Sequence, residues 1–173
     1  MDLRIVKTRR AIQSAFIELR KTTPLEKIKV RDLCKIALIN KSTFYNHYDD
    51  VFALSEEMEN ELLTRCMNDF EYKDCLLTDP MKFLKNVPVV LEKQEPVLSI
   101  LFSGRTDVLY KKIQRQLRKS YSSPKMTAEE EVKLTFVIGG TMYAMQELSD
   151  EGNYTKEEIS AYTAKVIESL MAH

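Results

Sequence analysis

The run from Lys41 to Tyr48 holds the side chains of this chain that are best suited to binding nucleic acid. It reads KSTFYNHY and contains no acid. On a helix, Phe44 and Tyr48 can face inward together with Ile39, which leaves the polar positions facing outward. Lysine can neutralise a phosphate, and hydroxyl, amide and imidazole groups can bond to base edges in a major groove. The outward positions are Lys41, Ser42, Thr43, Tyr45, Asn46 and His47. For so short a window, the alternative is a polar face exposed to solvent.

The residues before this run predict another short helix. Apolar residues at positions 30, 33, 36 and 37 recur at helical spacing, and residues 38–40 then break the pattern. Two short helices joined by a tight turn are the arrangement of a helix-turn-helix, in which the second helix enters the major groove. We therefore expect residues 41–48 to form a recognition helix.

Residues 30–54 resemble the DNA-binding domain of the tetracycline-repressor (TetR/AcrR) family of bacterial transcription regulators. The similarity is carried by Thr43-Phe44-Tyr45 followed by His47-Tyr48, about 40 residues from the N-terminus. The rest of the chain is similar only in length and helical character. The resemblance implies an all-α fold, with a three-helix DNA-binding domain over residues 1–50 and a helical ligand-binding and dimerisation domain over residues 51–173. It also implies a homodimeric repressor that binds a near-palindromic double-stranded operator and responds to a small-molecule effector.

Four positions depart from the pattern of that family. Lys29 stands where Ser or Thr is frequent, so a helix cap is lost but a phosphate contact is retained. Leu38 and Ser42 stand where Gly is common, and Val51 stands where Lys often opens the next helix. We add Lys29 and Arg31 to the residues expected to contact DNA. The departures leave room for an alternative function, in which a protein of this fold acts as a co-regulator through a protein partner.

The charges of the chain are segregated, although the formal net charge is zero. Residues 1–48 hold 11 basic and 4 acidic residues, and the remainder of the chain holds 15 basic and 22 acidic residues. A basic head on an acidic body directs phosphate binding to one end of the molecule. Basic residues of the first helix are further candidates for phosphate contacts, and a solvated face is the alternative.

Composition favours a helical globular protein. At 173 residues, 44% hydrophobic, the chain can bury a core without disulfides or metal, and four Gly with five Pro are few for a sheet protein rich in turns. The longest uncharged run, residues 134–146, is too short to span a bilayer, so we expect no membrane association. The N-terminus has no apolar signal segment, and the odd number of cysteines favours a reducing, cytoplasmic location.

The chain offers little for catalysis or metal binding. Its two histidines are His47 and His173, and its cysteines, Cys34, Cys66 and Cys75, have no metal-ligand spacing. The sequence contains no convincing nucleophile-and-base set and no glycine-rich phosphate loop, so we expect no enzyme, no metal site and no cofactor. A thiol switch at Cys66 and Cys75 is conceivable, but small buried side chains are the favoured interpretation.

Local signals predict the remaining helices. We expect a helix over residues 2–21 with apolar positions 5, 12, 16 and 19 inward, and a helix from residue 51 to about 70 behind the N-cap Asp50. Further helices are expected to begin at residues 80, 97 and 105, with a kink or break at Pro88. The helix from residue 105 is rich in Lys and Arg, for which an exposed amphipathic face is favoured over a second nucleic-acid patch. Capping boxes at Thr127 and Thr155 open the last two helices.

The helix that begins near residue 128 is apolar nearly all round. Leu134 and Val137 belong to one side, and Val132 and Phe136 belong to the other. A helix of this kind must be covered on both sides. We therefore expect it to pair, with the last helix and the symmetry mates of both, in a four-helix dimer interface. The residues expected there are Gly139, Gly140, Tyr143, Tyr162, Val166 and Leu170.

Methionine and aromatic side chains are frequent between residues 58 and 145. Methionine fills irregular space and adapts to different guests, so we expect a mostly apolar small molecule to bind within this region. An ordinary filled core is the alternative. The helix beginning near Val51 would then transmit the effect of the ligand to the recognition helix.

Overall fold

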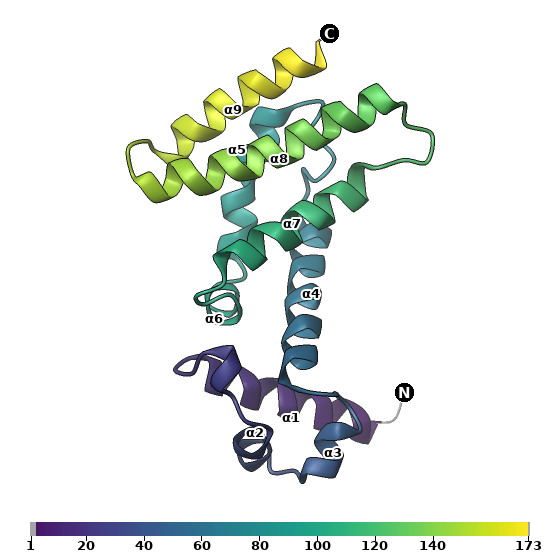
Figure 1. The fold of residues 1–173 in the computed structure, drawn as a ribbon, viewed down its shortest axis with the longest axis vertical. Coiled ribbons are helices and arrows are strands. Elements are labelled where there is room, and N and C mark those ends of the chain that lie inside the picture. Colours follow the sequence, from purple (N-terminus) through teal and green to yellow (C-terminus); the bar gives the residue numbers. More distant parts are fainter. Residues whose placement is uncertain (1–2, 173) are drawn as a thin grey trace. The chain divides into compact units, whose positions relative to one another are not determined.

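The computed structural model of the chain is all-α (Figure 1). It describes residues 3–172, and of residues 149–151 it describes only the backbone. Over this described part there are nine α-helices and one 3-10 helix, η1, and no strand. The predicted all-α class is confirmed.

The chain divides into two compact units. Unit 1 comprises residues 1–64 and 94–106, and unit 2 comprises residues 65–93 and 107–173. Helix α4, Val51–Asp69, contributes residues to both units. Unit 1 therefore includes more than the expected domain of residues 1–50, because it also takes in most of α4 and a segment from the middle of the chain. The functional boundary at residue 50 remains a prediction.

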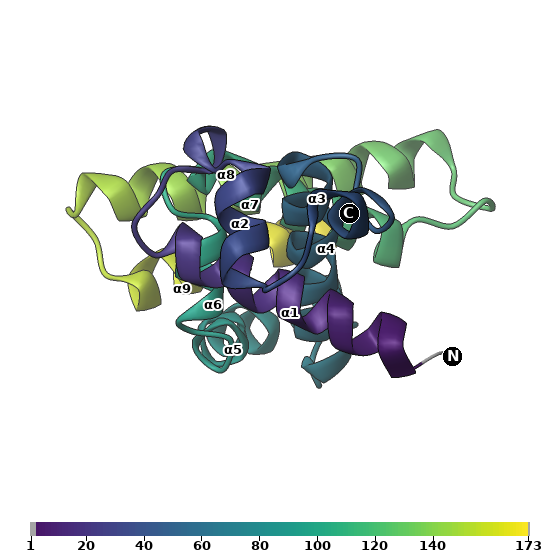
Figure 2. The same cartoon turned by 90° about the horizontal axis from the view of Figure 1, so that it is seen from below.

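Unit 1 is built around helix α1. Its elements are α1 (Leu3–Arg20), η1 (Leu25–Lys27), α2 (Val30–Ile36), α3 (Lys41–Tyr45), most of α4, and α6 (Val97–Leu101). Helix α1 packs against α2 and α6, and α2 packs against α3. Within this unit, α2 and α3 lie on the same side of α1, and the turn that joins them lies away from α1 (Figure 1, Figure 2).

The apolar stripe predicted for α1 is confirmed at its centre. Ile12 and Phe16 are fully buried, whereas Leu19 is half-buried and Ile5 is 50% exposed. The helix begins at Leu3 and ends at Arg20, close to the expected bounds, of which residue 2 lies outside the described residues. The first turn of α1 therefore presents apolar as well as basic side chains to solvent.

Arg20, a basic residue at the end of the first helix, is buried and only 3% exposed, so it is neither a candidate for a phosphate contact nor part of a solvated face. Its guanidinium donates hydrogen bonds to the carbonyl oxygens of Thr23 (3.0 Å), Leu101 (3.1 Å) and Ser103 (3.3 Å). A buried cation needs such acceptors. Arg20 thereby joins the end of α1 to the end of α6, two segments far apart in the sequence.

Unit 2 is a layered helical body. Its helices are the end of α4, α5 (Pro80–Glu92), α7 (Thr106–Tyr121), α8 (Ala128–Glu151) and α9 (Lys156–Met171). Helix α9 packs against both α5 and α8. The core draws apolar side chains from each of these helices and from the segment just after α4, among them Cys66, Phe70, Phe83, Leu84, Leu117, Val137, Ile138 and Ile167.

Pro88 does not break its helix. The sequence predicted either a kink or a break at this residue, and the break is not observed. Helix α5 continues past it to Glu92. Phe83 and Leu84 before the proline and Val90 after it are all buried in the core of unit 2. Burial on both sides of Pro88 offsets the loss of one backbone hydrogen bond.

Side-chain caps mark the starts of four helices, at the predicted positions Asp50, Thr127 and Thr155 and also at Asp79. Asp50 accepts a hydrogen bond from the backbone N–H of Ala53 (2.8 Å), and Asp79 accepts one from that of Lys82 (3.1 Å). Both capping boxes are present, at Thr127 with Glu130 and at Thr155 with Glu158. Hydrogen bonds to Thr127 and Thr155 hold the pKa of each partner carboxyl below its ordinary value. These local bonds define where α4, α5, α8 and α9 begin.

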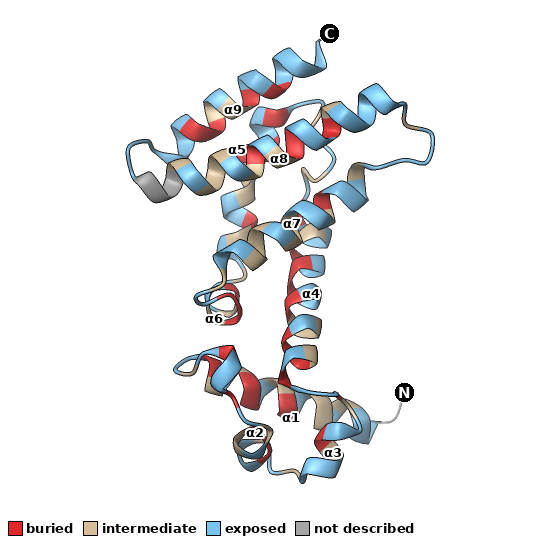
Figure 3. Cartoon of the chain, viewed as in Figure 1, coloured by how far each residue is buried: buried red, intermediate tan, exposed pale blue. Residues whose placement is uncertain are grey.

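Helix α8 has one buried side and one exposed side (Figure 3). Leu134, Val137 and Ile138 are each 2% exposed, whereas Phe136 is 68% and Tyr143 is 67% exposed. The prediction of two apolar sides is confirmed, and the chain itself covers one of them. Phe136 and Tyr143 consequently do not belong to the interior in which we expected a ligand.

Candidate nucleic-acid interface

The candidate interface is the surface formed by α2, the turn at residues 37–40, and α3. Asn40 is the N-cap of α3, and its Oδ1 accepts hydrogen bonds from the backbone N–H of Thr43 (2.7 Å) and from the hydroxyls of Ser42 (2.7 Å) and Thr43 (2.8 Å). Asn40 was not among the predicted site residues, although Asn three residues before a helical Thr is a recognisable N-cap signal. The cap orients two of the predicted DNA-contacting side chains.

Helix α3 is shorter than the run of residues 41–48 suggested, since it ends at Tyr45. The backbone N–H groups of His47 and Tyr48 both donate to the carbonyl of Phe44, at 2.9 and 3.0 Å, so the chain leaves the helix in a turn. Asn46 and His47 therefore lie at the end of the helix and in this turn. The inward positions are confirmed, because Phe44 is fully buried, Tyr48 is 6% exposed and Ile39 is half-buried.

The predicted outward residues lie on the surface of this segment. Lys41, Ser42, Tyr45 and Asn46 are exposed, and Thr43 and His47 are half-buried. The Tyr45 ring meets the buried Phe44 ring edge to face, with centroids 5.5 Å apart, while remaining 53% exposed. Its phenol is thus presented to solvent from an oriented ring.

Lys29 and Arg31 are both exposed at the start of α2. Lys29 is the N-cap residue and makes no side-chain cap, as its departure from Ser or Thr suggested. The Nε of Arg31 lies 3.0 Å from the carboxylate of Asp32, and this hydrogen bond holds the pKa of Asp32 below its ordinary value. Lys29 is therefore the better candidate for a phosphate, because Arg31 is engaged with a neighbouring acid.

A cluster of Arg9, Tyr48, Glu57 and Glu61 ties the segment just after α3 to α1 and α4. The hydroxyl of Tyr48 donates to Glu57 (2.6 Å), and the guanidinium of Arg9 lies 3.0 Å from Glu57 and also pairs with Glu61. Burial and the Glu57 hydrogen bond raise the pKa of Tyr48 to about 12. Arg9 is thereby paired with two acids. It is therefore no longer a candidate among the basic residues of α1 that we expected to contact DNA phosphates.

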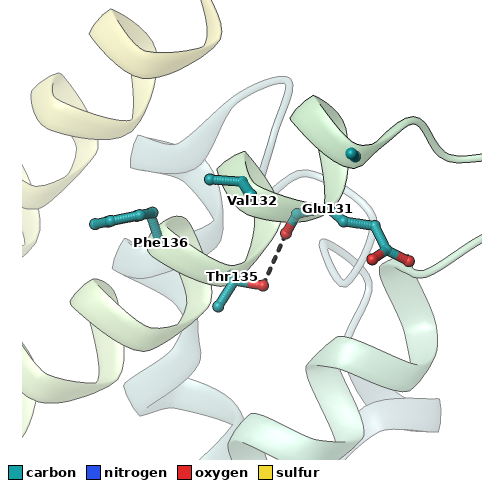
Figure 4. A pocket seen from close by; sticks show the side chains of 5 residues that line it. Glu131, Val132, Thr135 and Phe136 are labelled. Carbon is teal, nitrogen blue, oxygen red and sulfur yellow. Dashed lines mark hydrogen bonds between the residues drawn. The ribbon is translucent and has the colours of Figure 1, made fainter.

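Helices α8 and α9 each carry exposed residues from the set predicted for dimerisation. On α9, Tyr162 is 66%, Val166 is 59% and Leu170 is 38% exposed, whereas Ile159, from the same predicted stripe, is buried. Beside Val132 and Phe136 lies an open groove of about 300 Å³, lined also by Ala128, Glu131 and Thr135 (Figure 4). Within the described part of the chain, more than half of the surface of each of four apolar residues stays exposed: Val132, Phe136, Tyr162 and Val166.

The glycine pair of α8 leaves room on this side. A Cβ atom at Gly140 would meet no atom within 4 Å, and one at Gly139 would meet only Nε2 of Gln114, at 3.8 Å. Glycine inside a helix costs about 1 kcal/mol relative to alanine. Close approach by a helix of the same chain therefore does not explain these two glycines.

Other sites considered from the sequence find little support. In the basic helix α7, Lys111 lies 3.3 Å from Asp107 and Arg118 donates to the Thr135 hydroxyl. Burial raises the pKa of the Cys66 thiol, which makes it less reactive, and Cys75 is half-buried.

The described residues contain no group of three or more His, Cys, Asp or Glu that could hold a metal ion. None of the described helices is long and apolar enough to cross a membrane.

No family model matches this chain, and no curated protein sequence matches it.

Proposed function

We propose that this protein is a sequence-specific DNA-binding regulator of transcription, a homodimeric repressor of the tetracycline-repressor type. The observation that carries the proposal is the acid-free surface of α3. Lys41, Ser42, Tyr45 and Asn46 are exposed there, while Phe44 anchors the opposite side of the helix in unit 1. In this proposal α2 and α3 form a helix-turn-helix, and α3 enters the major groove.

The roles of the side chains follow from their chemistry. Lys41 and Lys29 neutralise phosphates, which positions the protein but carries no sequence information. Tyr45, Asn46 and His47 offer hydroxyl, amide and imidazole groups to base edges. The hydroxyls of Ser42 and Thr43 both donate their protons to Oδ1 of Asn40. In the complex each hydroxyl therefore either accepts a hydrogen bond from DNA, or leaves Asn40 and donates its proton to a phosphate oxygen.

The proposed homodimer uses the exposed side of α8 and α9. A single α3 reads few base pairs, and two copies related by a two-fold axis read a near-palindromic operator. The exposed Phe136, Tyr143, Tyr162 and Val166, together with the open glycine notch at Gly140, support a self-complementary helical interface. A partner helix can approach most closely where the helix surface has no side chain.

A small-molecule effector remains part of the proposal, within residues 58–145. The methionine and aromatic side chains that motivate it include the buried Phe70, Phe83 and Phe102, and the half-buried Met142 and Met145. An effector that lowers operator affinity by some factor must be bound more weakly by that same factor in the presence of operator.

The decisive experiment is selection of genomic DNA fragments by the purified full-length chain, followed by footprinting of the recovered site. We expect a near-palindromic site with half-sites about one helical turn apart, bound by two copies of the chain. A triple variant, Lys41→Ala with Tyr45→Ala and His47→Ala, should fold but lose the site. If the selection enriches no site above bulk DNA, the proposal is overturned. A co-regulator that acts through a protein partner would then be favoured.

A further inference from the structure

Leu38 combines an unfavourable backbone conformation with an unburied side chain. It has a φ of 55° and is the one non-glycine residue with positive φ in the described part of the chain. Its side chain is 90% exposed, the highest value among the exposed large hydrophobic residues of the described chain. Neither property stabilises the folded chain.

The left-handed conformation follows from the way α2 ends. The backbone N–H of Ile39 donates to the carbonyl of Cys34 (3.0 Å), which is the long hydrogen bond of a Schellman motif. This motif requires a left-handed residue just before Ile39, where glycine is strongly preferred because it has no Cβ. Leucine occupies that position here, with its side chain almost fully exposed.

The surroundings of Leu38 suit an anionic partner with an apolar contact point. Between Leu33 and Tyr48 the chain has no acid, and the exposed Lys35 and Lys41 flank Leu38 at three residues on either side. The turn that carries Leu38 leads directly into the Asn40 cap and the start of α3, on the side of unit 1 away from α1 (Figure 1). Duplex DNA offers both parts of such a partner, since thymine places a C5-methyl group in the major groove beside the phosphates.

We infer that Leu38 is a specificity-determining residue that packs against the C5-methyl group of one thymine in each operator half-site. This inference rests on the proposed function, because it requires that the surface of α2 and α3 enters a major groove. It adds a contact from the turn between the helices to those expected from α3 itself. The contact also covers, in the complex, an apolar side chain that the free chain leaves in water.

The test replaces each thymine of the selected operator, one symmetric pair at a time, by deoxyuridine, which removes only the methyl group. Burial of one methyl group corresponds to a factor of about 3 to 5 in affinity. For the unmodified protein we expect one thymine pair at which deoxyuridine weakens binding by about 9- to 25-fold, the product of the factors at the two half-sites. Leu38→Ala should bind the thymine operator more weakly than the unmodified protein does, by a factor similar to that caused by deoxyuridine. It should no longer distinguish thymine from deoxyuridine at that pair.

Two further variants separate this contact from a change in folding. Leu38→Gly should have an equal or higher Tm, because glycine suits the left-handed position, and should show the same loss of discrimination as Leu38→Ala. Val89→Ala truncates another exposed aliphatic side chain, in α5, and should retain the discrimination of the unmodified protein.

The outcomes distinguish this inference from the proposed function. If the unmodified protein binds the operator but no thymine is sensitive to deoxyuridine, the inference is overturned and the proposed function stands. The inference also fails if Leu38→Ala keeps the sensitivity of the unmodified protein. If the unmodified protein selects no site, the proposed function fails first, and the inference falls with it.

Discussion

The guanidinium of Arg105 lies 2.6 Å from the carboxylate of Glu59, a side chain that is only 1% exposed. The hydroxyl of Ser55 donates to the same carboxylate oxygen, also at 2.6 Å. Glu59 and Ser55 belong to α4, and Arg105 follows α6, so this pair holds the segment of residues 94–106 in unit 1. Arg20 supports the same segment from α1, through its hydrogen bonds to the carbonyls of Leu101 and Ser103.

Arg105→Ala should therefore destabilise the protein by about 3 kcal/mol, because it removes the paired cation from a buried carboxylate. We would measure the free energy of unfolding by urea denaturation. Lys111→Ala is the matched control, since it breaks an exposed pair with Asp107 and should cost less than about 0.5 kcal/mol. Equal effects of the two substitutions would show that the Glu59–Arg105 pair contributes no more than a surface pair.

Tyr48 should make stability fall at alkaline pH. Its pKa is raised to about 12 by burial and by the Glu57 hydrogen bond, against about 10 in the unfolded chain. The folded state therefore keeps the phenol protonated where the unfolded state ionises, and the corresponding stability, fully present below pH 10, is lost between pH 10 and 12.

The variant Tyr48→Phe tests this dependence. At pH 8 it should be less stable than the unmodified protein by about 1 kcal/mol, because it lacks the hydrogen bond to Glu57. The difference should shrink as pH approaches 12, when the unmodified protein loses its advantage. Urea midpoints at pH 8, 10 and 11.5 provide the measurement, and a difference that stays constant with pH would contradict the prediction.

Lys41→Ala should lower operator affinity about equally on all DNA sequences. If Lys41 contacts a phosphate, its loss should reduce the slope of log affinity against log salt by about one unit per half-site. Tyr45→Ala should instead relax specificity at one base position. Lys21→Ala is the control, because Lys21 pairs with Glu18 at the far end of α1, and it should leave the salt slope unchanged. A sequence-dependent loss in Lys41→Ala would assign it to base reading.

Gly140→Glu should convert a dimer to monomers without unfolding the chain. A side chain fits at this position, where a Cβ meets no atom within 4 Å, and glutamate favours helix more than glycine. Val166→Glu, on α9, should have the same effect on mass and should remove cooperative operator binding. Light scattering at micromolar concentration gives the mass. Lys156→Glu is the control, because it places the same acid in the first turn of α9, and this variant should remain dimeric. If the unmodified chain is itself monomeric, the proposed interface is refuted.

Much of the helical framework was predictable from the sequence because its signals are local. Caps such as Asp50 and Thr127 act on residues three positions away, so they define helix starts whatever the rest of the chain does. The division of residues 39–48 into inward and outward side chains also follows from helical spacing, and Phe44 confirms it. The end of α3 was less predictable, because it depends on a turn at Asn46 and His47 rather than on apolar spacing.

Tertiary structure alone decided which charges are buried and which apolar faces are not. Arg20 and Glu59 have the same local sequence signals as surface residues, and they are buried because Leu101 and Arg105 come from a segment more than 40 residues further along the chain. The two apolar sides of α8 could not be ranked from periodicity, which reports that a face is apolar but not what covers it. Burial depends on contacts between distant segments, whose formation reflects the free energy of the whole packed unit, and no local pattern encodes that quantity.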